Sequence, residues 1–444
     1  MKSEIRREKQ LRLFAWWLAV ALTVFISLPS NQTPIKLLIT VPILLCLPAN
    51  RRLDRKFLIL GVGLTIFGAF LNVYDFLLND KNWKMVNLYV TDIAFFTWLA
   101  VRLAGNVSFP DALVRSIRWS YASINICHLL LIVMSLNSIP IPQAVATSLA
   151  YNFGVSTEYG FWAFTSKLLV QQLFLLPCML GLFFLDPSPW PFARKLMFAL
   201  SVLLNFASLR LGLILTTVIA TVILIWISRK RRTPNASAPI LVGLGMVASI
   251  VVVVVGGSVL SGMYQLKFDD KLEGKDPRYQ QAVVWLTYWQ EAPLLGHGLS
   301  SVAIELADFD GTLTLQLNGK LHNEFGYELL PLKALAEMGL IGVVVYAGFI
   351  YIVFASLGTA IYRLRQNRGR PKAYMACESV RLAMGCYLFA SCTNGYLISF
   401  GGLFGVFIPY ALAWFYGNEA FSYPSRATEK RFPIALANKN ATCN

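Results

Sequence analysis

Three residues of this sequence have side chains that together suit one reaction: Arg210, Arg278 and His322. Arg210 lies between two apolar runs, Arg278 opens an amphipathic stretch, and His322 precedes a long apolar run. Two guanidinium groups suit a diphosphate leaving group, because each forms forked hydrogen bonds to phosphate oxygens and stabilises the charge that develops there. A histidine titrates near neutral pH, so it would take the proton from an attacking hydroxyl. The combination predicts transfer from a polyprenyl-diphosphate donor at the outer face of a membrane.

Residues beside His322 are secondary candidates, and other chemistries lack their usual residues. Lys320 would add charge near the diphosphate, Asn323 would orient His322, and Glu324 is a further polar candidate. The alternative is that all three are solvated loop residues. The sequence has no carboxylate cluster, glycine-rich phosphate loop, HExxH motif or CxxC pair. We therefore expect neither a metal nor another cofactor.

The composition is that of a membrane protein. Of the 444 residues, 56% are hydrophobic and 14% are charged, and the mean hydropathy is +0.58. A membrane-spanning helix needs about 20 apolar residues. We predict an all-α multi-span membrane protein with about 12 transmembrane helices. The apolar runs lie near residues 13–29, 34–49, 57–78, 85–103, 119–139, 161–185, 196–209, 211–227, 240–258, 339–360, 375–398 and 403–418.

The net charge of +16 predicts the orientation of these helices rather than a nucleic-acid partner. Most of the 39 basic residues fall in loops on one side if the amino end is cytoplasmic, as the positive-inside rule requires. Both termini are then cytoplasmic, and the basic loops meet membrane lipids. The predicted organisation is nine spans in residues 1–256, a large periplasmic loop with amphipathic helices in 257–338, three spans in 339–418 and a cytoplasmic tail in 419–444.

The outer loop contains one stretch with a clear helical pattern. Pro277 suits the first turn of a helix, and the aromatic residues from Trp285 to Trp289 are interpreted as an anchor in the membrane interface. The cluster from Pro293 to Gly298 predicts the turn that ends this helix. His297 within that turn is interpreted as a surface residue, and His128, inside an apolar run, as a packed core residue.

Four short motifs follow one another along the carboxyl-terminal two thirds of the chain. They are FGVST at residues 153–157, an outward arginine at Ser208–Leu209–Arg210, the R-x6-W and P-x-x-G-x-G patterns from Arg278 to Gly298, and LHNE leading to GLIG from Leu321 to Gly342. In this order they resemble the O-antigen ligase family of Gram-negative inner membranes, over roughly Tyr151 to the carboxyl end. Leu211 departs from the family's usual small residue. Asn323 and Gly339 are unusually far apart, which predicts extra turns of helix or a bend at Pro331.

This resemblance implies a function, a site and a fold. Such enzymes transfer a completed O-antigen glycan from undecaprenyl diphosphate to a sugar hydroxyl of lipid A-core, at the periplasmic face of the inner membrane, without metal or nucleotide. The resemblance implies that His322 activates the acceptor hydroxyl and that Arg210 and Arg278 hold the donor diphosphate. It also implies a fold similar to the glycosyltransferase C class, with periplasmic helices over a lipid-accessible cavity, and inversion of the anomeric carbon in a single displacement.

Other readings of the same residues stay open. An O-antigen polymerase uses the same donor but extends another undecaprenyl-linked glycan; the LHNE motif and the single large outer loop favour the ligase. A protein O-oligosaccharyltransferase shares the same constellation. A multi-span transporter would use Arg210 as a substrate-site charge, but it predicts internal repeats that the sequence lacks. The simplest alternatives are a snorkelling Arg210 and a solvated Arg278.

Overall fold

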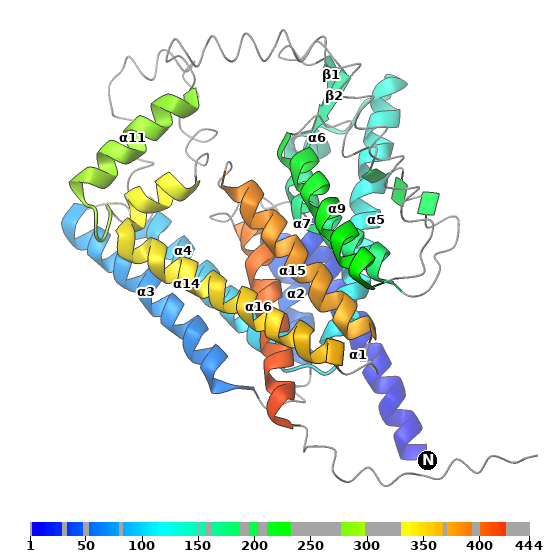
Figure 1. The fold of residues 1–444 in the computed structure, drawn as a ribbon. Helices are drawn as coiled ribbons and strands as arrows, with labels where there is room; N and C mark the ends of the chain where they lie inside the picture. The colour runs from blue at the N-terminus through cyan, green and yellow to red at the C-terminus, as the bar shows by residue number, and fades with distance from the viewer. Residues whose placement is uncertain are drawn as a thin grey trace, which may run out of the picture.

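The computed structural model describes residues 2–28, 33–47, 53–79, 83–149, 151–155, 162–186, 195–196, 198–199, 201–202, 204, 211–231, 277–297, 330–366, 371–392 and 400–422. Within these residues the chain forms twelve helices and two strands (Figure 1). They are α1 (Lys2–Ser27), α2 (Thr33–Cys46), α3 (Arg55–Asn79), α4 (Trp83–Ala104), α5 (Phe109–Leu136), α6 (Gln143–Leu149), β1 (Asn152–Val155), β2 (Trp162–Thr165), α7 (Leu169–Leu185), α9 (Leu211–Arg231), α11 (Pro277–Glu291), α14 (Leu330–Gln366), α15 (Pro371–Ser391) and α16 (Phe400–Ser422).

The core consists of helices packed on helices. α7 contacts α5, α9 and α15, and every residue of α7 except Val170 is buried. Its sequence is apolar on nearly all faces, and a helix of this kind is stable only when neighbouring helices or lipid cover it. α16 is buried in the same way from residue 404 to 416 and contacts α4 and α14. The two most apolar helices therefore form the centre of the bundle.

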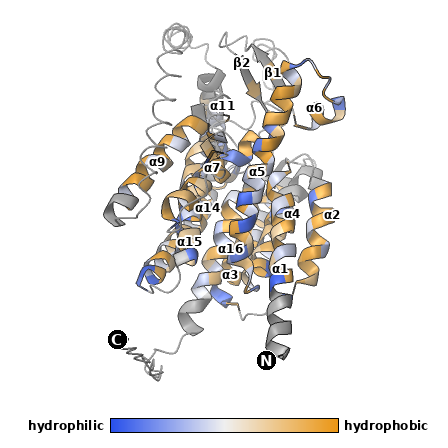
Figure 2. Cartoon of the chain, turned by 90° about the vertical axis from the view of Figure 1, so that its right-hand side faces the viewer, coloured by the Kyte–Doolittle hydropathy of each residue, from blue (hydrophilic) through white to orange (hydrophobic). Residues whose placement is uncertain are grey.

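The outward faces of the bundle are also apolar. Figure 2 shows hydrophobic residues on the outer sides of helices such as α2 and α9. On α3 the exposed apolar residues recur at helical spacing along most of the helix, so they form one continuous stripe. The stripe consists of Leu58, Ile59, Val62, Ile66, Phe70, Val73 and Leu77. Two of the described helices, Phe109–Leu136 and Pro331–Gln366, are long and apolar enough to cross a membrane.

The predicted apolar runs agree with the observed helices in most places. The runs at 196–209 and 240–258 lie largely or wholly outside the described residues, and each of the other ten contains a helix. α5 begins at Phe109, earlier than the run predicted from residue 119, because Pro110 starts the helix. The exposed Asp111 and Arg115 interrupt the apolar run there without interrupting the helix. The number of membrane crossings stays a prediction.

A short antiparallel ribbon interrupts the otherwise helical fold. β1 pairs with β2 so that Phe153 faces Phe164 and Val155 faces Trp162. The apolar run at 161–185 therefore begins as a strand and becomes helical only at Leu169. Aromatic and β-branched residues favour strands, and here they pair across the ribbon. The predicted all-α class thus holds for the described residues apart from this ribbon.

Two arginines of the predicted cytoplasmic loops hold helix ends together. Arg102, in the last turn of α4, donates from Nε and Nη2 to the carbonyl oxygen of Leu44 and from Nη2 to those of Leu45 and Leu47, at 2.8–3.1 Å. These carbonyls lie at the carboxyl-terminal end of α2, where the last carbonyl groups of a helix lack the usual intrahelical partners. The Leu44 carbonyl oxygen also accepts from the Leu47 amide at 3.3 Å. Arg118 of α5 pairs with Asp186, directly after α7, at 3.7 Å.

The elements around the candidate site lie at one end of the bundle. Figure 1 shows α11, α6 and the ribbon at the top, and the beginning of α1 at the bottom. Figure 2, a quarter turn away, shows the same separation. Below, the end that carries α11 and the ribbon is called the outer end.

Candidate functional site

Arg278 is the second residue of α11, which begins at Pro277 as predicted. Proline fits this position because the first amide of a helix has no intrahelical acceptor and the ring fixes a helical φ. The backbone of Arg278 therefore lies at the amino-terminal end of α11, where unpaired amides and the helix dipole favour an anion. Of the predicted site residues, Arg278 is the one that lies within the described residues.

The aromatic face of α11 packs against protein, which corrects the interpretation as a membrane anchor. Trp285 is 1% exposed and Tyr288 is 8% exposed, and both form a cluster with Ala336 and Leu332 of α14. An amphipathic sequence specifies that one face is apolar but not what covers it. Here α14 covers Trp285 and Tyr288, so these residues attach α11 to the helix bundle.

The turn after α11 forms where the sequence predicts it. α11 ends at Glu291, and the Gly296 amide donates to the Ala292 carbonyl oxygen at 2.9 Å. The indole Nε1 of Trp289 donates to the Pro293 carbonyl oxygen at 3.1 Å, so the last aromatic residue of α11 closes this turn. Gly296 has φ +70°, a conformation that glycine adopts without steric cost.

Backbone hydrogen bonds fasten this turn to the beginning of α14. We call the two segments together, residues 292–297 and 336–342, the α11–α14 joint. Two glycine motifs that are far apart in the sequence thereby become one structural unit. The bonds run from the His297 amide to the Ala336 carbonyl oxygen (2.9 Å), from Leu340 to Pro293 (2.9 Å) and from Ile341 to Leu294 (3.1 Å).

Of the two predicted alternatives, α14 has the extra turns of helix rather than a bend at Pro331, and it bends at Gly339. Gly339 has φ +63° and ψ −173°, whereas Pro331 is the second residue of the helix and starts it without a bend. The bend frees the amides of Leu340 and Ile341 from the helix, and these amides bind the turn after α11. The unusual length between Asn323 and Gly339 is thus partly taken up by a helical segment, residues 330–338, that lies before the bend.

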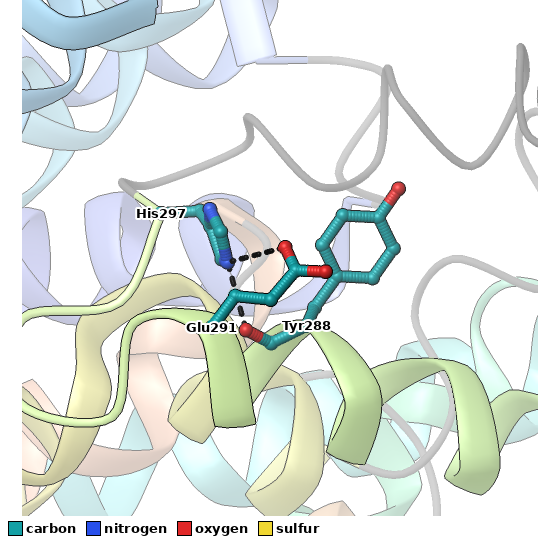
Figure 3. Close-up of polar contacts among 3 residues, drawn as sticks. All are labelled: Tyr288, Glu291 and His297. Carbon is teal, nitrogen blue, oxygen red and sulfur yellow. Dashed lines mark hydrogen bonds and ion pairs between the residues drawn. The ribbon is translucent and has the colours of Figure 1, made fainter.

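His297 connects the turn to both α11 and α14, and Figure 3 shows its contacts with α11. Its Nε2 lies 2.7 Å from the carbonyl oxygen of Tyr288, so Nε2 carries the hydrogen and donates it. The same nitrogen lies 3.7 Å from Glu291, whose side chain is largely exposed. Its backbone amide binds α14. The predicted surface histidine is therefore a half-buried structural residue, with its ring turned toward α11 (Figure 3).

A buried ion pair lies on the same short segment of α14. Lys333 Nζ is 3.6 Å from Glu337 Oε1, and the two side chains are 2% and 0% exposed. The pair lies one helical turn apart, which is the spacing that favours such contacts. This ion pair was not predicted from the sequence. The signal was a lysine and a glutamate four residues apart in KALAE, residues 333–337. Glu337 also precedes the bend closely, so its backbone contacts Gly296.

The joint rests on α3 as well. Met338, Ala334 and Leu295 pack with Leu71 and Phe67, which lie in the outer half of α3. These contacts place α11 and the beginning of α14 over the outer end of the bundle. The helices thus position the joint from two sides, through α3 and through the rest of α14.

The FGVST motif is partly in the ribbon. Phe153, Gly154 and Val155 belong to β1, while residues 156 and 157 lie outside the described residues. Tyr151, just before β1, shares a hydrogen bond of 3.4 Å with Ser135 at the end of α5. Burial raises the pKa of the Tyr151 phenol above its ordinary value, so the hydroxyl stays protonated at neutral pH.

His128 is a core residue, as predicted. It is fully buried in α5, and its ring lies 5.1 Å from that of Phe164. Among the residues described, no group of three or more histidine, cysteine, aspartate or glutamate residues is arranged to hold a metal ion.

The remaining predicted site residues lie outside the described residues. These are Arg210, His322, Lys320, Asn323 and Glu324. Two described helices begin shortly after two of these residues. α9 begins immediately after Arg210, and α14 begins eight residues after His322.

Comparison with known protein families gives a match that covers part of these elements. Residues 196–347 match a family model described as O-Antigen ligase. No curated protein matches the chain significantly. The matched segment contains α9, α11, the joint and the first half of α14, and it supports a function of the O-antigen ligase or polymerase type. Residues 196–347 of the chain are therefore similar to the O-antigen ligase family.

Proposed function

We propose that the chain is an O-antigen ligase. It transfers O-antigen polysaccharide from undecaprenyl diphosphate to a sugar hydroxyl of lipid A-core at the periplasmic face, which completes lipopolysaccharide. His322 is the general base, and Arg210 and Arg278 bind the donor diphosphate. The observation that carries this proposal is that the family match at residues 196–347 includes all three residues.

The proposed reaction is a single displacement. The acceptor hydroxyl oxygen attacks the anomeric carbon of the donor glycan, and His322 takes its proton. A new glycosidic bond forms while the bond between the anomeric carbon and the diphosphate oxygen breaks. The electron pair leaves with undecaprenyl diphosphate, and the two arginines stabilise the charge that develops there. Lys320, Asn323 and Glu324 are secondary candidates that supply charge or orient His322.

We further propose that the chain is a multi-pass protein of the bacterial inner membrane. About 12 spans, cytoplasmic termini and a periplasmic loop over residues 257–338 follow from its apolar runs and its basic loops. The continuous exposed apolar stripe of α3 supports this, because such a surface is stable against hydrocarbon rather than water. The position of α11 opposite the amino terminus is consistent with the same orientation.

A reconstituted transfer assay tests the proposed chemistry. The purified protein in lipid nanodiscs receives an undecaprenyl-diphosphate-linked glycan and lipid A-core, and the capped product is measured by gel shift. We expect His322→Ala to reduce transfer by at least about 100-fold, as the loss of a general base does. Arg210→Lys and Arg278→Lys keep a charge but lose the forked geometry, and we expect about tenfold or larger losses. Arg363→Lys, at an exposed site in the last turn of α14, is the matched control.

The same assay distinguishes the alternatives. Near-normal transfer by His322→Ala would exclude His322 as the base. Full activity of both arginine variants would contradict the proposal that Arg210 and Arg278 bind the donor diphosphate. Elongation of the lipid-linked glycan without transfer to lipid A-core would indicate a polymerase. With periplasmic proteins added as a second acceptor, transfer only to protein would indicate an oligosaccharyltransferase.

A further inference from the structure

The α11–α14 joint brings together two glycine-containing motifs that are separated by about forty residues in the sequence. Gly296 belongs to the turn that ends α11, and Gly339 to the bend of α14. Three backbone hydrogen bonds of 2.9–3.1 Å join the two segments. Backbone bonds of this kind fix distance and direction more strictly than side-chain contacts, because they leave no rotamers to adjust.

No side chain fits at either glycine. A Cβ at Gly296 would lie 2.6 Å from the amide nitrogen of Gly339 and from the Glu337 carbonyl oxygen. A Cβ at Gly339 would lie 2.5 Å from the Leu295 amide nitrogen and would overlap the Leu294 carbonyl group. Both residues also have positive φ, which side chains disfavour. Any larger residue must therefore separate α11 from α14.

His297 closes the joint on the side of α11. Its amide donates to α14 at Ala336, and its Nε2 donates to the last turn of α11 at Tyr288. One residue thus fixes the turn to both helices, and Figure 3 shows its contacts with α11. Both contacts are N–H donations to carbonyl oxygens, so a side-chain amide donor of similar reach can replace the imidazole in the second.

The joint lies at one end of α11 and Arg278 at the other. α11 has 15 residues and is about 22 Å long. A change of about 10° in its direction at the joint would move the far end by about 4 Å over that length. A displacement of about 1 Å at a reacting group can cost about 100-fold in rate. The direction of α11 at the joint therefore determines where Arg278 lies.

We propose that Gly296, His297 and Gly339 are positioning residues for the transfer: they hold α11 at a fixed angle to α14 and so place Arg278. This inference rests on the proposed function. In this inference the two glycine motifs set the direction of the donor-binding helix and do not contact the substrate themselves.

The experiment compares five variants of the full-length protein in the reconstituted assay. Gly296→Ala and Gly339→Ala open the joint, and His297→Leu removes the side-chain donor while keeping apolar volume. His297→Gln restores a donor at similar reach. Gly348→Ala is the matched control, because a Cβ at this position of the same helix has no atom within 4 Å. For each variant we measure kcat, KM for the donor and for the acceptor, the pH profile and the thermal unfolding midpoint.

We expect Gly296→Ala and Gly339→Ala to lower kcat at least tenfold, with a larger effect on kcat than on KM for the acceptor. His297→Leu should lower kcat about five- to tenfold while its unfolding midpoint stays within a few degrees of the wild type. His297→Gln should recover most of the rate with an unchanged pH profile, whereas an acid or base at this position would shift the profile. Gly348→Ala should match the wild type.

Two outcomes would overturn the inference, and one would overturn the proposed function instead. Wild-type kcat in His297→Leu, or in a folded Gly339→Ala protein, would show that the joint does not position the site. Equal losses of kcat in His297→Leu and His297→Gln would show that the hydrogen bond from His297 to Tyr288 does not matter for the rate. No transfer by the wild-type protein, with both substrates present, would reject the proposed function itself.

Discussion

At the scale of single residues, the buried charges and aromatic rings of α11 and α14 hold the outer end together. Lys333 and Glu337 are buried side by side, and a charge that loses its partner in such a place has no water to replace it. Trp285 fills the contact between the two helices. Replacing these residues should change the stability of the protein, which can be measured without substrate.

Glu337→Gln should lower the free energy of unfolding by about 3–5 kcal/mol, because it leaves the buried Lys333 ammonium without its ionic partner. Replacing both residues, as Lys333→Met with Glu337→Leu, should recover most of that loss, since two apolar side chains of similar volume need no compensation. Thermal unfolding of the purified protein measures both. If the single and double variants lose the same stability, the ion pair does not explain the effect.

Trp285→Ala should destabilise the protein by about 3–5 kcal/mol, because it removes a buried aromatic side chain and leaves a cavity between α11 and α14. Trp226→Ala is the matched control, since Trp226 is exposed on α9. The measurement is again the unfolding midpoint, together with proteolysis near residue 292. Similar behaviour of the two variants would contradict the packing of Trp285 on α14.

At the scale of elements, the ends of helices depend on residues far away in the sequence. α2 has only 14 residues, and its carboxyl-terminal carbonyl groups are bound by Arg102 from α4. A short helix loses much of its stability when its end groups have no partner. The positive-inside rule gives Arg102, as a basic residue between two apolar runs, only a part in setting the orientation, and the structure gives it this second role.

Arg102→Ala should lower the free energy of unfolding by about 1.5–3 kcal/mol, since the hydrogen bonds of a charged donor to Leu44, Leu45 and Leu47 are lost. Arg102→Lys should recover only part, because an ammonium cannot make the same set of bonds as the planar guanidinium. Hydrogen exchange of the α2 amides is the direct measurement, with Arg363→Ala as a control. Unchanged protection of α2 in Arg102→Ala would contradict this role.

The elements themselves were largely predictable from the sequence, whereas their contacts were not. Long apolar runs specify helices because length and hydropathy are local properties. The start of α11 at Pro277 and the turn after it follow from local backbone preferences. The run at 161–185 was misread at its beginning, because a short apolar stretch fits a strand or a helix equally well.

The contacts at the candidate site depend on pairings between distant segments. Nothing local indicates that Gly296 meets Gly339, or that Trp285 faces α14 rather than lipid. The bend lies at Gly339 and not at Pro331 because proline fits the first turn of a helix, whereas glycine adopts positive φ readily. Local residue types thus predicted that these positions were special but not which partner each would have.

At the scale of the whole molecule, the account requires a fixed orientation in the membrane. The inner end contains the beginning of α1 and the end of α2, and the outer end contains α11 and the ribbon. Two exposed cysteines mark the two sides: Cys46 ends α2, and Cys392 directly follows α15. The predicted topology places Cys46 near the cytoplasmic end of the span at 34–49 and Cys392 near the periplasmic end of the span at 375–398.

A membrane-impermeant maleimide should therefore label Cys392 in intact spheroplasts and reach Cys46 only after lysis. Cys392→Ser and Cys46→Ser assign the labelled sites, and a variant with both changes gives the background. Labelling of Cys46 before lysis, with Cys392 protected, would show the opposite orientation. α11 would then lie on the cytoplasmic side, away from a periplasmic acceptor.

The most direct test of the central claim is the glycan pattern of a strain that lacks this protein. Lipid A-core and the undecaprenyl-linked pool are separated and compared with those of the complemented strain. The account predicts lipid A-core without O-antigen, together with accumulated long polymer on undecaprenyl diphosphate, and no recovery with a His322→Ala gene. A single repeat unit on lipid A-core would instead indicate a polymerase, and unchanged glycans would contradict the proposed function.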